Sequence, residues 1–215
     1  MKILSPFGPR IAQLKFSKNL INKINNEVDR ITSQKKLARK YDYSKKLVGQ
    51  VKQEIQLPPK FIKKYLSREI NSSIKKYIKS ITVKFTKTVK IKNLWVVSQF
   101  SHEYNPVHYH DGHVSGVGYL RIPKFYNNDK KDLKTNGTID FINGNKMFLN
   151  NSIFNHNPRV GDVILFPNYL MHTAYPFSSK GERRSFSFNT EIDNDIANVF
   201  KKWVKKYKKM FSVSL

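Results

Sequence analysis

The sequence of 215 residues contains no cysteine. This absence excludes disulfide bonds, thiolate metal ligands and cysteine nucleophiles together. A metal site or a nucleophile must therefore come from other residue types. A reducing compartment is compatible with such a chain, and we expect a cytoplasmic protein.

Long apolar runs are also missing. No stretch approaches the roughly 18 uninterrupted apolar residues of a membrane span, and the segment 1–6 lacks the apolar core of a secretory signal. We therefore expect no membrane span. Hydrophobic residues still make up 39% of the chain, including 15 Phe and 11 Tyr, which is typical of a globular domain and not of a disordered tail.

Acidic residues are scarce: 15 Asp and Glu stand against 40 Lys and Arg, and the formal net charge is +25. Clustered basic residues attract phosphate, so nucleic acid is one candidate partner. However, only eight of the basic residues are Arg, the usual choice for bidentate recognition of phosphates and base edges. Lys, Asn and Ile are also what A/T-rich codons encode, so composition alone accounts for the charge and nucleic-acid binding is not favoured.

The periodicity of apolar residues predicts helices first and strands later. Ser17 is expected to cap a helix that runs to about Leu37, and a second helix is expected from Lys60 to about Ile78, with a polar connection at 42–57. Both helices read as packing elements. Short β-rich runs separated by turn signals follow at 81–85, 89–100, 114–122, 138–142, 162–166 and 185–190.

Many short strands without intervening helices indicate an antiparallel sandwich or barrel. We divide the single domain 1–215 into a mainly helical support (1–79), a β core (80–191) and a tail (192–215). The loop at 124–136 is long and charged. The tail has apolar residues on one face of a lysine-rich helix expected at 196–211, which either packs on the sheet or meets a membrane or polyanion surface.

Six histidines are the main candidates for chemistry. His108 and His110 are two residues apart, so in a β-strand both imidazoles face the same side. His113 breaks that phase. His172 follows the apolar run 163–167 and is a candidate third ligand, because a metal site needs convergent donors from distant strands.

The segment 183–189 alternates, placing Arg183, Ser185, Ser187 and Asn189 on one face and Arg184, Phe186 and Phe188 on the other. An Arg and a Ser two apart on an inward strand can hold a carboxylate through charge-assisted hydrogen bonds. Arg184 is interpreted as a solvated surface charge.

These motifs together resemble the 2-oxoglutarate/Fe(II) oxygenases. The resemblance rests on the HxH of His108 and His110, the run 115–120 ending in Tyr-Leu, Gly-Asp-Val-Ile-Leu-Phe-Pro at 161–167, His172, and Arg183 with Ser185. The segments 104–110, 115–120, 161–167 and 183–189 are similar to a branch common in marine bacteria and their phages, as are 6–9 and 49–55. For a phage-encoded chain, the compartment is the host cytoplasm.

The resemblance implies an α+β protein: a double-stranded β-helix (jelly-roll, cupin-like), with N-terminal helices packed on one sheet and a C-terminal helix. It assigns the metal to His108, His110 and His172, and the far carboxylate of 2-oxoglutarate to Arg183 and Ser185, with Tyr119 supporting that cosubstrate. His110 stands where most relatives carry Asp or Glu, so Asp111 is the fallback carboxylate. Three neutral imidazoles suit Zn(II) as well as Fe(II).

The implied activity is a dioxygenase that uses Fe(II), 2-oxoglutarate and O2, with ascorbate as a stimulant, and hydroxylates a small-molecule or peptide substrate while releasing succinate and CO2. Asn105, Ser115 and Ser187 are further pocket candidates. The alternative is a non-catalytic, Zn-bound β-helix module, or a phage accessory protein that binds nucleic acid.

Overall fold

The computed structural model describes residues 8–82, 84–124 and 135–197, which form two antiparallel sheets and a layer of helices. The expected tail helix at 196–211 and the loop at 124–136 fall mostly outside the described residues. Only α5 (Asn194–Ala197) is described from the tail. No helix in the described segments is long and apolar enough to cross a membrane.

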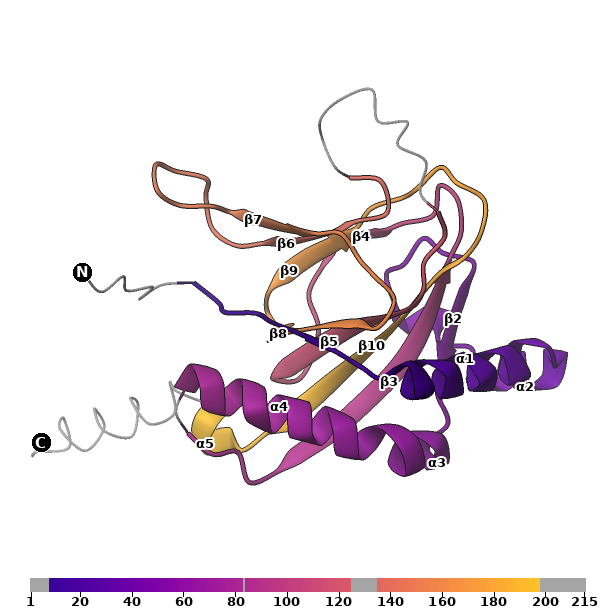
Figure 1. Cartoon of the computed structure of the whole chain (residues 1–215), viewed down its shortest axis with the longest axis horizontal. Helices are drawn as coiled ribbons and strands as arrows, with labels where there is room; N and C mark the ends of the chain where they lie inside the picture. The colour runs from indigo at the N-terminus through magenta and orange to yellow at the C-terminus, as the bar shows by residue number, and fades with distance from the viewer. Residues whose placement is uncertain (1–7, 83, 125–134, 198–215) are drawn as a thin grey trace, which may run out of the picture.

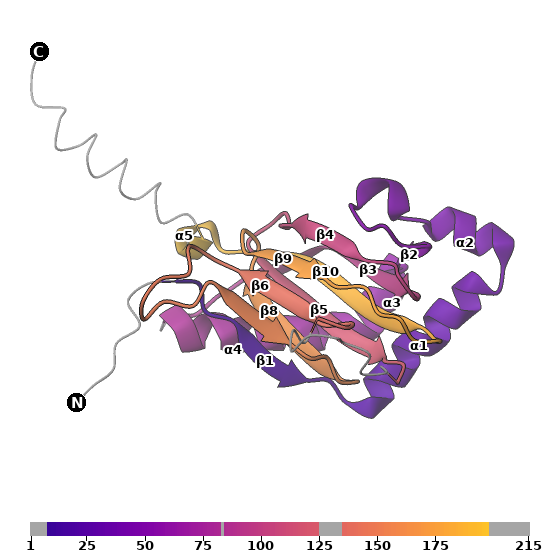
Figure 2. The ribbon, with the colours of Figure 1, turned by 90° about the horizontal axis from the view of Figure 1, so that it is seen from above.

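The large sheet has the strand order β1-β8-β5-β10-β3-β2. Its strands are β1 (Ala12–Lys15), β2 (Gln53–Gln56), β3 (Val89–Gln99), β5 (Val114–Arg121), β8 (Asp162–Pro167) and β10 (Arg183–Ile192). The small sheet has the order β4-β9-β6-β7, with β4 (Asn105–His108), β6 (Ile139–Ile142), β7 (Ile153–His156) and β9 (Met171–Ala174). Figure 1 shows the small sheet facing the large one, and in Figure 2 the strands β4, β9 and β6 lie over it. This arrangement confirms the double-stranded β-helix.

The helices cover the outer face of the large sheet (Figure 1). They are α1 (Lys18–Thr32), α2 (Lys35–Tyr41), α3 (Pro59–Phe61), the π-helical turn η2 (Ile62–Leu66) and α4 (Ser67–Thr82). The 3-10 turn η1 (Ser44–Lys46) lies instead beside the inner cavity, which Lys46 lines. Ile24 on α1 and Ile74 on α4 are fully buried and share one apolar cluster with Phe186 and Phe188 of β10. The N-terminal helices therefore pack on one sheet, as expected.

Strand alternation divides the large sheet into two faces. On β10, Phe186 and Phe188 point toward the helices, while Arg183, Ser185 and Ser187 line the inner cavity. The phase predicted for 183–189 is therefore confirmed.

Several boundaries differ from the sequence-based predictions. Ser17 caps α1, since its hydroxyl accepts from the Leu20 amide at 3.3 Å, but the helix ends at Thr32 and α2 is a separate helix. The run 81–85 is not a strand, because α4 continues to Thr82 and Phe85 is exposed. Four short strands were not predicted: β1, β2, β7 and β9. Each has four residues, too few for an alternation pattern to be distinctive.

Candidate functional site

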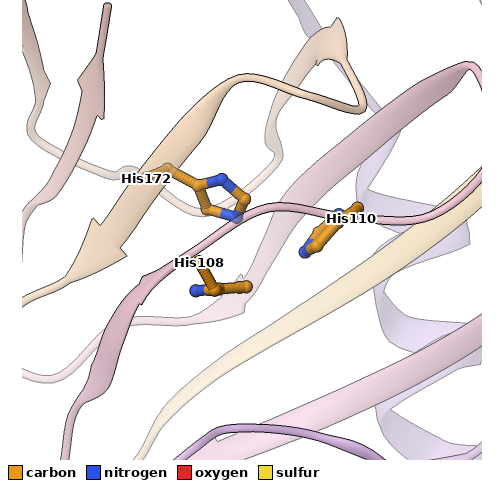
Figure 3. Close-up of side chains that lie close together, drawn as sticks. All are labelled: His108, His110 and His172. Carbon is orange, nitrogen blue, oxygen red and sulfur yellow. The ribbon is translucent and has the colours of Figure 1, made fainter.

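Three histidines converge where β4 and β9 of the small sheet meet the inner face of the large sheet. The potential ligand atoms of His108, His110 and His172 all lie within 4.8 Å of one another. Figure 3 shows the three imidazoles gathered close together. The structure thus brings together the three residues singled out in the sequence.

Cross-strand pairing explains two of the three positions. His108 on β4 lies directly opposite His172 on β9, and side chains of such pairs are near neighbours on one face. Their ring centroids are 4.2 Å apart. The Nδ1 atom of His108 lies 2.7 Å from the Pro106 carbonyl, and that of His172 lies 2.9 Å from the Leu170 carbonyl. These contacts fix the ring orientations and leave each Nε2 available to a metal.

His110 does not reach the cluster by the strand alternation that its spacing from His108 predicts. Strand β4 ends at His108. The backbone of His110 is held beyond the strand by Asn168, whose carbonyl accepts from the His110 amide at 2.9 Å and whose side chain donates to the His110 carbonyl at 3.2 Å. Its ring lies 5.5 Å from that of Trp95, and its Nδ1 is buried without a hydrogen-bond partner among the described residues.

The electrostatics of the cluster favour neutral imidazoles. Burial, together with the nearby His108, lowers the pKa of His172 to about 3. Burial and the two neighbouring histidines place the pKa of His110 well below its ordinary value, and burial lowers the pKa of His108. A neutral imidazole carries the lone pair that a divalent metal requires.

Asp111, the fallback carboxylate, points elsewhere. Its side chain is 77% exposed and pairs with the ammonium group of Lys92 at 2.7 Å. The cluster of potential ligands in the described residues contains His110 and not Asp111. The geometry therefore favours the three-histidine set over a facial triad with Asp111.

Arg183 is the second notable group in the cavity. Only 2% of the residue is exposed, and its guanidinium donates to the Gln99 side chain at 3.2 Å and to the Tyr175 carbonyl at 3.5 Å. Its Nε has no hydrogen-bond partner, and it forms no ion pair within the described segments. A buried cation without a counter-charge is costly, so this position fits an anionic ligand.

Two further residues assigned to the cosubstrate lie near Arg183. Ser185 lines the cavity one alternation further along β10. Tyr119 on β5 is fully buried, and its ring centroid is 5.5 Å from the Arg183 guanidinium carbon. Tyr119 supports Arg183 from behind and is not one of the lining residues.

Arg184 corrects one interpretation from the sequence. It was interpreted as a solvated surface charge, but it is only 4% exposed. Its guanidinium pairs with Asp29 of α1 and with Glu182, each at 2.7 Å. Arg184 therefore ties the outer face of β10 to the helix layer, which sequence patterning could not show because Asp29 is remote in the chain.

The cavity between the sheets has a volume of about 780 Å³. Asn105 and Ser187 line it as expected, whereas Ser115 faces Asn189, to which its hydroxyl donates at 2.9 Å. Glu54, Tyr43 and Trp95 also line the cavity, although the sequence did not single them out. For Glu54, the available signal was the alternation of 53–57, hidden in a segment interpreted as a polar connection.

Comparisons with known proteins agree with this geometry. Residues 93–189 match the family model described as "Putative 2OG-Fe(II) oxygenase". No curated protein sequence matches the chain.

Three solved structures have similar folds. The viral collagen prolyl hydroxylase of Paramecium Bursaria Chlorella virus-1, in complex with 2-oxoglutarate, has 13% identity over 84% of this chain and 94% of its own, with a TM-score of 0.53. The Trichoplax adhaerens prolyl hydroxylase bound to a hypoxia-inducible factor peptide has 10% identity over 88% and 86%, with a TM-score of 0.57. HygX of Streptomyces hygroscopicus, with nickel and 2-oxoglutarate, has 14% identity over 84% and 81%, with a TM-score of 0.53.

The matched segment runs from β3 to β10 and contains all three clustered histidines together with Arg183, Ser185 and Tyr119. The comparisons do not address the marine-bacterial and phage branch, which stays a prediction. Fe(II) and 2-oxoglutarate are the cofactors of the matched family. Through this β-helix core, residues 93–189, the chain matches the 2-oxoglutarate/Fe(II) oxygenases.

Proposed function

We propose that this chain holds Fe(II) on His108, His110 and His172 and hydroxylates a small-molecule or peptide substrate in the host or cellular cytoplasm, releasing succinate and CO2. One observation carries the proposal. A buried arginine without a counter-ion in the described part of the chain shares one cavity with three convergent, neutral imidazoles. The buried arginine is unfavourable without an anion, and the three clustered imidazoles are unfavourable without a metal. Together they match a metal and a dicarboxylate.

Each residue has a distinct role in this proposal. The Nε2 atoms of His108 and His172 would bind the metal, since their Nδ1 atoms face backbone carbonyls. Arg183 would bind the far carboxylate of 2-oxoglutarate with help from Ser185, and Tyr119 would keep the guanidinium in place. Bound Fe(II) supplies the oxidising chemistry that converts O2, 2-oxoglutarate and a C–H bond into a hydroxyl group, succinate and CO2.

The cavity walls would exclude bulk water from this chemistry. Phe166 and Phe141 pack against the His172 ring, with centroid distances of 4.9 and 5.8 Å. Trp95 covers His110 from the large sheet. Such an apolar surround strengthens the electrostatic interactions made inside the site.

Substitution of a metal ligand tests the proposal. We expect His172→Ala to weaken binding of Fe(II) or Zn(II) by more than about a hundredfold, because even partners outside the metal shell contribute 10- to 100-fold. We also expect it to abolish 2-oxoglutarate consumption in the presence of Fe(II) and ascorbate. Metal content per folded molecule and succinate release are the measurements.

The matched control is His102→Asn. His102 is exposed, lies outside the cluster and adopts a φ of 67°, a conformation that Asn also tolerates. This variant should bind metal as the wild type does. Unchanged metal binding by His172→Ala would contradict the proposal.

A non-catalytic Zn(II) module is the second candidate, because a three-histidine set without a carboxylate suits zinc as well as iron. Metal identity in protein purified under anaerobic conditions separates the two. Iron with 2-oxoglutarate turnover supports the dioxygenase, whereas zinc retained alongside added Fe(II), without turnover, supports the module.

A further inference from the structure

A buried carboxylate lies on the wall of the same cavity and has no role in the proposed metal or cosubstrate site. Glu54 on β2 is only 2% exposed, and its Oε2 has no hydrogen-bond partner among the described residues. Its neighbours in sequence, Ile55 and Leu57, point toward the helices, so alternation turns Glu54 toward the cavity. A buried carboxylate is normally paired with a cation or well hydrogen-bonded.

The surroundings of Glu54 supply no such partner within the described segments. Glu54 forms no ion pair with any described residue, although the chain has 40 basic residues. Burial and the nearby Asp42 raise the pKa of Glu54 to about 7. The Glu54 carboxylate therefore has a hydrogen-bond acceptor without a described donor, in an otherwise strongly basic protein.

More acceptor surface and open space lie beside the carboxylate. A Cβ atom placed on Gly49 would be 2.7 Å from both Glu54 Oε1 and the Asn105 side-chain oxygen, so these two oxygens face one small gap. The Asn105 oxygen is also buried without a described partner. The orphaned Oε2 of Glu54 is a separate atom, so either orientation of the Asn105 amide leaves it available.

Aromatic rings complete this corner of the cavity. Tyr43 and Trp95 both line it, and their ring centroids are 6.0 Å apart. The Tyr43 ring already has a cation over it, since the ammonium of exposed Lys46 lies 5.2 Å from the ring centroid. A carboxylate flanked by aromatic faces is a general solution for binding ammonium and guanidinium groups.

The corner is connected to the proposed metal site. Trp95 lies between Tyr43 and His110, whose ring centroid is 5.5 Å from that of Trp95. Glu54 on β2 lies opposite Val97 on β3, and Val97 lies opposite Ser185 on β10. Glu54 is therefore two strands away from this cosubstrate residue. At about 4.8 Å per strand, this places the Glu54 backbone roughly 10 Å from that of Ser185.

We propose that Glu54, with Tyr43 and Trp95, forms the recognition site for a cationic substrate, one that carries an ammonium or guanidinium group several bonds from the carbon that is oxidised. This inference rests on the proposed function, because it assumes that the cavity receives a substrate beside the metal. It adds the chemical class of that substrate.

The test uses Zn(II)-loaded full-length protein with 2-oxoglutarate, so that binding is measured without turnover. The probes are n-butylammonium and n-butylguanidinium, with n-butanol as the neutral control. The Glu54 carboxyl is followed by carbon NMR across pH, and its signal is assigned by its loss in Glu54→Gln. We expect either cation to lower the apparent pKa of Glu54 by about one unit or more, as an opposite charge in contact does, and n-butanol to leave it unchanged.

Binding to variants gives a second readout. Glu54→Gln should bind n-butylammonium at least about tenfold more weakly than the wild type, since a charge-assisted hydrogen bond is lost. Glu69→Gln on the exposed face of α4 makes the same chemical change outside the cavity and should bind as the wild type does. If Glu54→Gln does not fold, through-bond NMR assignment of the Glu54 carboxyl in the wild type replaces assignment by loss, and the wild-type titration decides.

An apparent pKa of Glu54 that neither cation moves, or equal binding by Glu54→Gln and the wild type, would overturn the inference. The proposed function fails separately, through absence of 2-oxoglutarate consumption by the Fe(II)-loaded wild type. A cation-dependent shift without such consumption would leave the cation site standing and remove the dioxygenase proposal.

Discussion

At the scale of single residues, the two adjacent arginines of β10 have opposite environments. Arg183 faces the cavity and has no counter-ion among the residues that the structure describes, while Arg184 pairs with Asp29 and Glu182 on the other face. The alternation of a β-strand accounts for this division. Their substitution therefore separates ligand binding from stability.

We expect Arg183→Gln to weaken binding of 2-oxoglutarate to the metal-loaded protein by at least about a hundredfold, because a buried charge pair contributes several kcal/mol to ligand affinity. Metal content should stay unchanged, since Arg183 is not a potential ligand. Anaerobic titration calorimetry with Zn(II)-loaded protein measures the affinity without turnover.

Arg184→Gln is the matched control. It should lower the free energy of unfolding by about 1–3 kcal/mol through loss of charge-assisted hydrogen bonds, while the folded protein keeps its affinity for 2-oxoglutarate. Equal loss of affinity in both variants would show that the cosubstrate is anchored elsewhere.

The raised pKa of Glu54 predicts a pH dependence of stability that is independent of any ligand. Its pKa is raised from the ordinary 4.5 to about 7 in the folded state, so the folded state binds a proton more tightly than the unfolded state. The contribution of Glu54 to stability is therefore present below about pH 4.5 and is lost as pH rises toward 7.

Glu54→Gln removes this dependence. At pH 8 the variant should be more stable than the wild type by up to about 3 kcal/mol, from 1.36 kcal/mol per pKa unit, and the difference should shrink as pH falls to 5. Urea unfolding at the two pH values measures it. A constant difference at both would mean that Glu54 has an ordinary pKa.

At the scale of elements, β5 and β10 fit together through glycine. A Cβ on Gly116 would lie 2.3 Å from the Phe188 ring, and one on Gly118 would lie 2.3 Å from the Phe186 ring. The two glycines thus make room for the aromatic rings that join β10 to the helix layer.

We expect Gly118→Ala to lower the free energy of unfolding by about 1–3 kcal/mol, the usual cost of overpacking a core. Adding Phe186→Leu should recover part of that loss by opening space, a coupling that urea unfolding of the two single variants and the double variant would measure. A Gly118→Ala variant as stable as the wild type would show that the β5–β10 packing is looser than the structure indicates.

At the scale of the whole molecule, the charge of +25 is the most unusual property. In the described residues, the cavity wall carries the acid Glu54 and the paired Asp111 as well as Lys46 and Arg183. A nucleic-acid groove would gather basic residues and interleaved aromatics along one path to the site.

We therefore expect only weak binding to single- and double-stranded DNA, and we expect it to vanish near physiological salt, because counterion release dominates such contacts. Fluorescence anisotropy at increasing salt measures this. Tight binding that persists at physiological salt, and that is lost when the residues after Asn194 are removed, would point to a nucleic-acid substrate.

Local sequence patterns are sufficient to predict the long elements and the residue types of the site. The periodicity around Ile24, the strands of β3, β5, β8 and β10, and the phase of Arg183 against Phe186 are local patterns, and local patterns follow directly from backbone geometry. The family resemblance added the HxH pair, His172 and Arg183 as a set.

The features that depend on neighbours remote in the chain are visible only in the tertiary structure. Asn168 keeps His110 in the cluster after its strand has ended, and Asp29 turns Arg184 into a buried pair. Glu54 became a cavity residue only because β2 pairs with β3. Its four residues add an edge to a sheet whose other strands, apart from β1, come from much later segments. Burial and pairing depend on distances between such segments, and a charge in the sequence does not reveal whether its partner is water, an ion or nothing.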